Sequence, residues 1–107
     1  MTVVMCVELC GAEDIPQGEM RQFIVEGLDG AVAVANVDGE FFAFEDCCTH
    51  GAASLSEDGE LAGHTVECGW HRGQFDIRTG AVVASPCTVD LRTYKIDVRE
   101  GRLHISF

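Results

Sequence analysis

Apolar and polar positions alternate over short segments along most of the chain, and no long helical face appears. Apolar side chains that recur at every second position are typical of half-buried β-strands. The segments with this pattern are residues 3–9, 22–26, 31–37, 40–45, 93–99 and 102–107. The pattern therefore predicts an all-β fold.

Turn-forming residues separate these segments. They are Pro16-Gln17-Gly18, Asp29-Gly30, Asp38-Gly39, Arg78-Thr79-Gly80 and Glu100-Gly101. The Asp-Gly pairs suit tight hairpins, because Asp tolerates a left-handed backbone and Gly adopts it freely. Short strands joined by tight hairpins pair antiparallel, so we expect an antiparallel β-sandwich or open barrel.

The stretch from about residue 46 to residue 86 departs from this pattern. It combines short apolar pieces with six glycines and most of the cysteines and histidines. We expect it to be a small inserted subdomain built around a site. No internal repeat, low-complexity tract or linker is present, so residues 1–107 are predicted to form a single domain.

Charge narrows the range of partners. The chain has 18 Asp and Glu against 7 Lys and Arg, for a net charge of -11. Nucleic acid is an unexpected partner, because binding its phosphates requires clustered cations. The acid excess favours encounter with basic proteins, or else it only confers solubility.

The N-terminal segment and the cysteine content predict a location and a chemistry. The first fourteen residues have no basic region and no small-residue cleavage site, so they are not a signal peptide. The longest aliphatic run, residues 31–35, is too short to span a membrane. We therefore expect a cytoplasmic protein with no membrane partner. Disulfides are rare in that compartment, which favours metal binding or catalysis for some of the six cysteines.

Two short motifs carry candidate chemistry. Cys48-Thr49-His50 is a C-x-H motif, and Cys68-Gly69-Trp70-His71 is a C-x-x-H motif, with residues 51–67 between them. Two thiolates and two imidazoles suit either zinc or an iron-sulfur cluster, and ligand softness alone does not choose between them.

The surroundings of both motifs resemble the Rieske family. Each motif lies on a glycine-bearing loop, Cys48-Thr49-His50-Gly51 and Cys68-Gly69-Trp70-His71-Arg72-Gly73, and the second is followed by Gln74-Phe75-Asp76. This resemblance implies one Rieske-type [2Fe-2S] cluster per chain, whose inner iron is bound by Cys48 and Cys68 and whose outer iron is bound by His50 and His71. It also implies a Rieske-like β fold and a task of electron transfer.

Four positions in the motifs imply a low reduction potential. Ala53 and Trp70 stand where high-potential relatives have a disulfide, and Gly73 and Phe75 stand where they have a hydrogen-bonding serine and tyrosine. Without those donors, the added electron is less stabilised.

The segment 48–56 resembles the ferredoxin component of bacterial aromatic-ring-hydroxylating dioxygenases. This resemblance implies single-electron transfer from a flavin-dependent NAD(P)H reductase to a terminal oxygenase. Residues 72–107 are too few for the mononuclear iron domain of an oxygenase, so we expect an electron carrier rather than an enzyme. Alternatives are a Rieske carrier serving a nitrite reductase or diiron monooxygenase, and a zinc-binding module.

The remaining candidates have structural interpretations. We expect Cys47 to be a small buried side chain, because only Cys48 has the C-x-H spacing. Gly51, Gly69 and Gly73 either let backbone N–H groups approach the sulfur atoms or only form turns with positive φ. Further expectations concern side chains near strands or near the cluster: Cys6, Cys10 and Cys87 as thiols packed against strands, His64 and His104 as structural histidines, Leu55 and Phe75 as apolar shields, and Trp70 as a shield or a docking residue.

Overall fold

The computed structural model describes residues 5–28, 30–47, 54–69, 72–84 and 89–107. Within these residues the strands form two antiparallel sheets. The large sheet contains β1 (Cys6–Gly11), β2 (Met20–Ile24), β3 (Ala31–Val37), β4 (Glu40–Glu45), β9 (Thr93–Arg99) and β10 (Arg102–Ser106), in the order β1-β10-β9-β4-β3-β2. The small sheet contains β5 (Glu60–Ala62), β6 (Thr65–Glu67), β7 (Gln74–Asp76) and β8 (Val82–Ala84), in that order.

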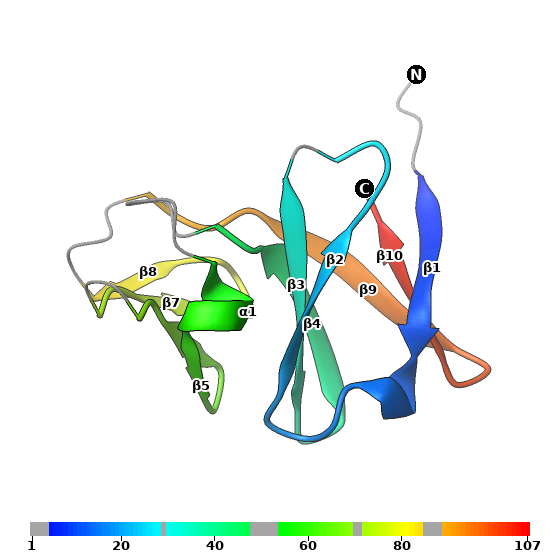
Figure 1. The fold of residues 1–107 in the computed structure, drawn as a ribbon, viewed down its shortest axis with the longest axis horizontal. Helices are drawn as coiled ribbons and strands as arrows, with labels where there is room; N and C mark the ends of the chain where they lie inside the picture. The colour runs from blue at the N-terminus through cyan, green and yellow to red at the C-terminus, as the bar shows by residue number, and fades with distance from the viewer. Residues whose placement is uncertain (1–4, 29, 48–53, 70–71, 85–88) are drawn as a thin grey trace.

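The large sheet curls into half of a barrel, which confirms the all-β prediction (Figure 1). β3 to β4 and β9 to β10 are hairpins whose two turn residues all have positive φ: Asp38 at 53° and Gly39 at 85°, and Glu100 at 51° and Gly101 at 74°. Two successive positive φ values define the turn that matches the twist of paired strands. The turns predicted at Asp38-Gly39 and Glu100-Gly101 are therefore confirmed. The Asp29-Gly30 hairpin stays a prediction, because Asp29 lies outside the described residues.

Strand β3 separates two hydrophobic cores. Val32 and Val34 face a core inside the half-barrel, together with Leu103 and Ile105. The alternate residues face the other way, toward the small sheet, in a second core. That second core contains Ala33, Ala35, Val37, Phe44, Leu55, Val66, Cys68, Phe75, Ile77 and Leu91. Because side chains alternate across a strand, β3 is covered on both faces.

The predicted strand boundaries differ from the structure mainly near the N-terminus. Residues 31–37, 40–45 and 93–99 are confirmed, and the last predicted strand ends one residue earlier. The segment predicted at 22–26 is instead Met20–Ile24, because its pairing with β3 runs from Met20 opposite Ala35 to Ile24 opposite Ala31. The first strand runs to Gly11 because a bulge after Glu8 extends its pairing with β10.

The small sheet follows α1 (Leu55–Asp58) and is inserted in the chain between β4 and β9. Figure 1 shows β5, β7, β8 and α1 at one end of the molecule, with β1 and β10 at the other. Sequence periodicity missed β5, β6, β7 and β8, because three residues are too few to establish an alternating pattern. A 3-10 turn (Ala12–Asp14) links β1 to the segment before β2. In the described part of the chain, no helix has the length and apolarity needed to cross a membrane.

Candidate metal centre

Each of the two sequence motifs falls within a loop whose ends are paired. Residues 48–53 lie between Cys47 and Ser54, which form an isolated antiparallel bridge. Residues 68–73 connect β6 to β7, where Glu67 pairs with Gln74. The side-chain nitrogen Nε2 of Gln74 also donates to the Glu67 carboxylate at 2.9 Å. The fold thus presents two six-residue loops with closed bases, one for each expected pair of ligands.

Cys68 is the one expected ligand within the described residues. Its side chain is 1% exposed and belongs to the core between the two sheets. Cys48, His50 and His71 lie outside the described residues, as do Gly51, Ala53 and Trp70. The four-residue ligand set therefore stays a prediction.

Backbone hydrogen bonds join the described residues at the two ends of the second loop. The Cys68 N–H donates to the Gly73 carbonyl at 2.7 Å, and the Arg72 N–H donates to the Cys68 carbonyl at 2.9 Å. Arg72 has a φ of 60°, a left-handed conformation that is uncommon for a side chain other than Gly, Asn or Asp. Such outliers concentrate at functional sites, where the surroundings hold the backbone in place. Two backbone hydrogen bonds and this left-handed residue therefore fix the described part of the second loop.

Gly69 brings the second loop against the helix that follows the first loop. A Cβ atom at Gly69 would overlap the carbonyl oxygen of Asp58, the last residue of α1. The φ of Gly69 lies outside the left-handed region, so the turn-geometry interpretation is wrong at this position. Glycine is required here because two backbones meet. The prediction that Gly51, Gly69 and Gly73 bring N–H groups toward a cluster remains a prediction.

Apolar side chains lie beside both loops. Leu55 begins α1 after the first loop, and Phe75 lies in β7 after the second. Both are fully buried in the same core as Cys68. Their burial agrees with the prediction, while shielding of a cluster stays a prediction.

This arrangement fits an iron-sulfur cluster. Soft thiolate sulfur is the ligand type that Fe–S clusters use, and Cys68 lies buried in an apolar core at the start of the second loop. The second motif brings an imidazole within the same six-residue connection. Where a cluster is bound, Cys68 and the second loop would hold one side of it.

The expectation that Cys47 is buried is wrong, because the side chain is exposed. Asp46, the preceding residue, occupies the buried position and is 3% exposed. Successive residues of an extended segment point to opposite sides, so an inward Asp46 turns Cys47 outward. The sequence contained a signal for the exposure of Cys47, since Asp46 lies two positions after the buried Phe44 and continues the inward-facing positions of β4.

The other described cysteines and histidines lie on or beside strands, but Cys6 is exposed, so the expectation that it is packed is wrong. Cys6 is exposed on β1, and Cys10 on the same strand is half-buried, where burial raises the pKa of its thiol. His104 lies in β10, and the ring of His64 meets the edge of Phe42 with 5.4 Å between centroids. Cys87 lies outside the described residues. Within the described ranges, no three His, Cys, Asp or Glu side chains gather as a metal-binding group.

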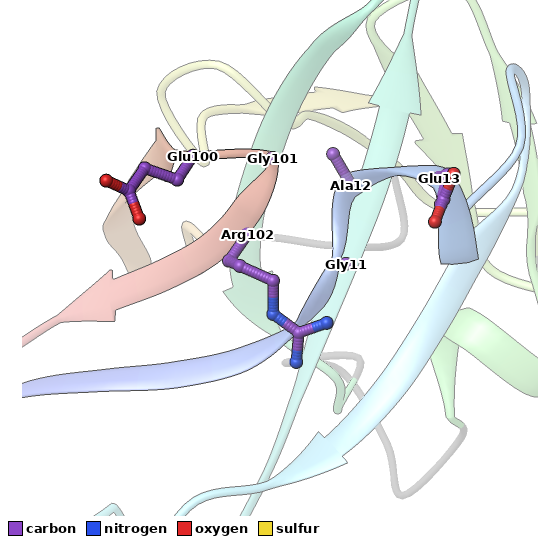
Figure 2. A pocket seen from close by; sticks show the side chains of 6 residues that line it. All are labelled: Gly11, Ala12, Glu13, Glu100, Gly101 and Arg102. Atoms are coloured by element: carbon purple, nitrogen blue, oxygen red, sulfur yellow. The ribbon is translucent and has the colours of Figure 1, made fainter.

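A cavity of about 340 Å³ lies away from the two loops. It is lined by Gly11, Ala12, Glu13, Glu100, Gly101 and Arg102, at the β9–β10 hairpin and the end of β1 (Figure 2). Figure 1 places this region across the large sheet from the small sheet. Arg102 is already paired with Glu8 at 3.0 Å. This cavity is separate from the candidate metal centre.

An ion pair at the end of β7 away from the second loop predicts a pH dependence. The Arg78 guanidinium donates to the Asp76 carboxylate at 2.8 Å, and this hydrogen bond lowers the pKa of Asp76 below its ordinary value of 3.8. A lowered folded-state pKa contributes stability above the unfolded-state pKa and loses it as the pH falls through the folded-state value. We expect wild type to be more stable than Asp76→Asn at pH 7, with the gap closing below about pH 4.

Urea unfolding of both proteins between pH 3 and pH 7 measures this gap. Arg78→Gln is the matched control, because it removes the same pair from the other side. A gap between wild type and Asp76→Asn that stays constant down to pH 3 would contradict the assignment.

Comparisons with known proteins agree with this geometry. The family model described as the Rieske [2Fe-2S] domain matches residues 5–95. The p-cumate 2,3-dioxygenase system ferredoxin component of Pseudomonas putida is 48% identical over 101 residues, which cover 94% of this chain and 84% of that protein.

Solved structures agree as well. A ferredoxin of Sphingomonas yanoikuyae B1 is 40% identical, with a TM-score of 0.88 over 94% of this chain and 97% of that one. A structure described as a complex of reduced oxygenase and oxidized ferredoxin in carbazole 1,9a-dioxygenase contains a chain that is 41% identical, with a TM-score of 0.88 over 94% of this chain and 91% of that one. With the family model matching most of its length, this chain belongs to the Rieske [2Fe-2S] domain family.

Proposed function

We propose that this protein carries single electrons from a flavin-dependent NAD(P)H reductase to the terminal oxygenase of an aromatic-ring-hydroxylating dioxygenase. The observation that carries the proposal is the pair of closed six-residue loops that contain the C-x-H and C-x-x-H motifs. Ferredoxin components of aromatic dioxygenase systems, 36 to 48% identical over most of the chain, support the recipient. The protein is an electron-transfer component and not itself an enzyme.

We infer that Cys48 and Cys68 bind one iron and that His50 and His71 bind the other. When bound, the cluster supplies a site that accepts and returns one electron. The chain's own contribution is to hold the ligand loops by their paired ends and to exclude water with Leu55 and Phe75. The absence of hydroxyl groups at Gly73 and Phe75 supports a low potential.

A complex of oxygenase and ferredoxin exists for a carbazole dioxygenase system whose ferredoxin chain is 41% identical to this one. This supports a terminal oxygenase as the electron acceptor. The reductase is inferred from the chemistry, since a one-electron carrier needs a donor that splits the electron pair of NAD(P)H, as a flavin does. Dependence on NAD(P)H in turn supports a cytoplasmic location.

We further propose that residues 1–107 form a single domain with the cluster-binding subdomain at about 46–86. The core that contains Cys68 supports this, because it combines residues of β3 and β4 with residues of α1 and the small sheet. Burying one set of apolar side chains between the two sheets couples their stability.

The test is dithionite reduction of anaerobically purified protein, followed by low-temperature EPR and quantification of iron and acid-labile sulfide. We expect two irons and two sulfides per chain, a Rieske-type signal, and a midpoint potential near the bottom of the Rieske range of about -150 to +300 mV. Zinc without sulfide would contradict the proposed function. A midpoint well above zero would contradict the low-potential assignment alone.

A further inference from the structure

Asp46 carries a buried carboxylate at the edge of the first loop. The residue is 3% exposed, and in the described part of the chain no Lys or Arg forms an ion pair with it. Four donors surround its two oxygens: Gln22 Nε2 at 2.6 Å, Ser54 Oγ at 2.8 Å, the Ser56 backbone N–H at 2.6 Å and Ser56 Oγ at 2.6 Å. Within the described residues, neutral donors therefore provide the hydrogen bonds that a buried carboxylate requires.

These donors come from both sides of the loop that contains Cys48 and His50. Gln22 lies in β2, at one edge of the large sheet. Ser54 and Ser56 lie where the chain returns from the loop and begins α1, and Ser54 is the N-cap of that helix. The carboxylate therefore links the large sheet to the start of α1 across the base of the loop.

The backbone of Asp46 completes the connection. Its N–H donates to the Ala31 carbonyl at 3.0 Å, and its carbonyl accepts from the Leu55 N–H at 3.0 Å. One residue later, Cys47 pairs with Ser54. Side chain and backbone of Asp46 thus hold the two ends of the loop at a defined separation and direction.

We propose that Asp46 is the positioning residue of the first ligand loop: its carboxylate holds the loop ends so that Cys48 and His50 meet the cluster in one geometry. This rests on the proposed function, because it takes these two residues as ligands. The groups that orient metal ligands, and not only the ligands, set how tightly a metal is held and how its electronic structure is tuned. Hydrogen bonds to a charged acceptor are shorter and stronger than neutral ones, which suits a carboxylate to this task.

The test compares Asp46→Asn with Asp38→Asn. The first variant keeps the size of the side chain but puts an NH₂ group against donors such as the Ser56 N–H. Asp38 is a matched control, because it also accepts from a glutamine, Gln17 Nε2 at 3.2 Å, but lies in the exposed β3–β4 turn. Asn tolerates the left-handed conformation of that turn.

We expect Asp46→Asn to lose iron and sulfide to a chelator roughly 10- to 100-fold faster than wild type and Asp38→Asn. We also expect shifted EPR g values and an altered midpoint potential in its remaining clusters. Hydrogen exchange of the β3 amides, which reports global unfolding, should change far less. Ser56→Ala, which removes one of the four bonds, should show smaller changes in the same direction and covers the case in which Asp46→Asn does not fold.

The proposal is overturned if Asp46→Asn and Ser56→Ala keep wild-type chelator resistance and g values. It is also overturned if cluster loss in both variants only follows the global unfolding measured by β3 exchange. Wild-type protein without iron and sulfide would instead contradict the proposed function, so the two failures are distinguishable.

Discussion

Serine in place of Cys48 is expected to remove the cluster almost completely, whereas serine in place of Cys47 should leave it intact. A Rieske cluster needs two thiolates on one of its irons, and only Cys48 stands two residues before a histidine. The structure adds that Cys47 is exposed and pairs through its backbone with Ser54, at the base of the loop rather than within it. Iron and sulfide content with EPR of the reduced proteins measures both variants.

Cys68→Ser is the companion variant and should match Cys48→Ser, because Cys68 is the corresponding ligand on the second loop. Circular dichroism separates loss of the cluster from loss of the sheets. Cluster loss in Cys47→Ser together with retention in Cys48→Ser would reverse the ligand assignment.

Alanine in place of Gly69 is expected to have the second large effect, although it adds only a methyl group. The new Cβ would overlap the Asp58 carbonyl, so either α1 or the second loop has to move. Overpacking that displaces backbone costs about 1–3 kcal/mol, and we place this substitution at about 3 kcal/mol because both partners are backbone. We expect most of the cluster to be lost, since the moved segment lies between Cys68 and His71.

Gly63→Ala is the control for this prediction. Gly63 lies in the β5–β6 turn of the small sheet with a φ of 58°, and a Cβ there would meet nothing within 4 Å. Its cost is backbone strain alone, about 1 kcal/mol, without displacement of a loop. Urea unfolding and cluster content measured on both variants test the difference. Equal cluster content in the two would show that the contact between Gly69 and Asp58 does not position the loop.

Some features of the candidate site were predictable from the sequence and others were not. The spacing of the cysteines and histidines identified the two motifs, and the burial of Leu55 and Phe75 agrees with their expected apolar role. The burial of Asp46 was missed, and with it the exposure of Cys47. A carboxylate two residues before a ligand is usually solvated, and its partner Gln22 is 24 positions away in the chain.

The structural role of Gly69 was also not predictable from the sequence. Glycine in a loop often marks a backbone conformation or a close contact that a side chain would prevent. From the sequence, the two interpretations of Gly69 were close approach of its N–H to a cluster and a turn with positive φ. In the structure, glycine is needed because a Cβ atom would overlap the carbonyl of Asp58, eleven positions earlier. A steric contact between a loop and a helix depends on how they pack, which a pattern along the chain does not report.

By itself, the sequence determined the alternating segments of the large sheet, the two Gly-containing hairpins and the spacing of the two motifs. These are local properties, because alternation, turn conformation and ligand spacing depend on residues that are near one another in the chain. Only the tertiary structure decided the pairing of the three-residue strands, the four donors around Asp46 and the contact at Gly69. Each of these depends on packing between segments that are not neighbours in the chain, and that packing brings the second loop against α1.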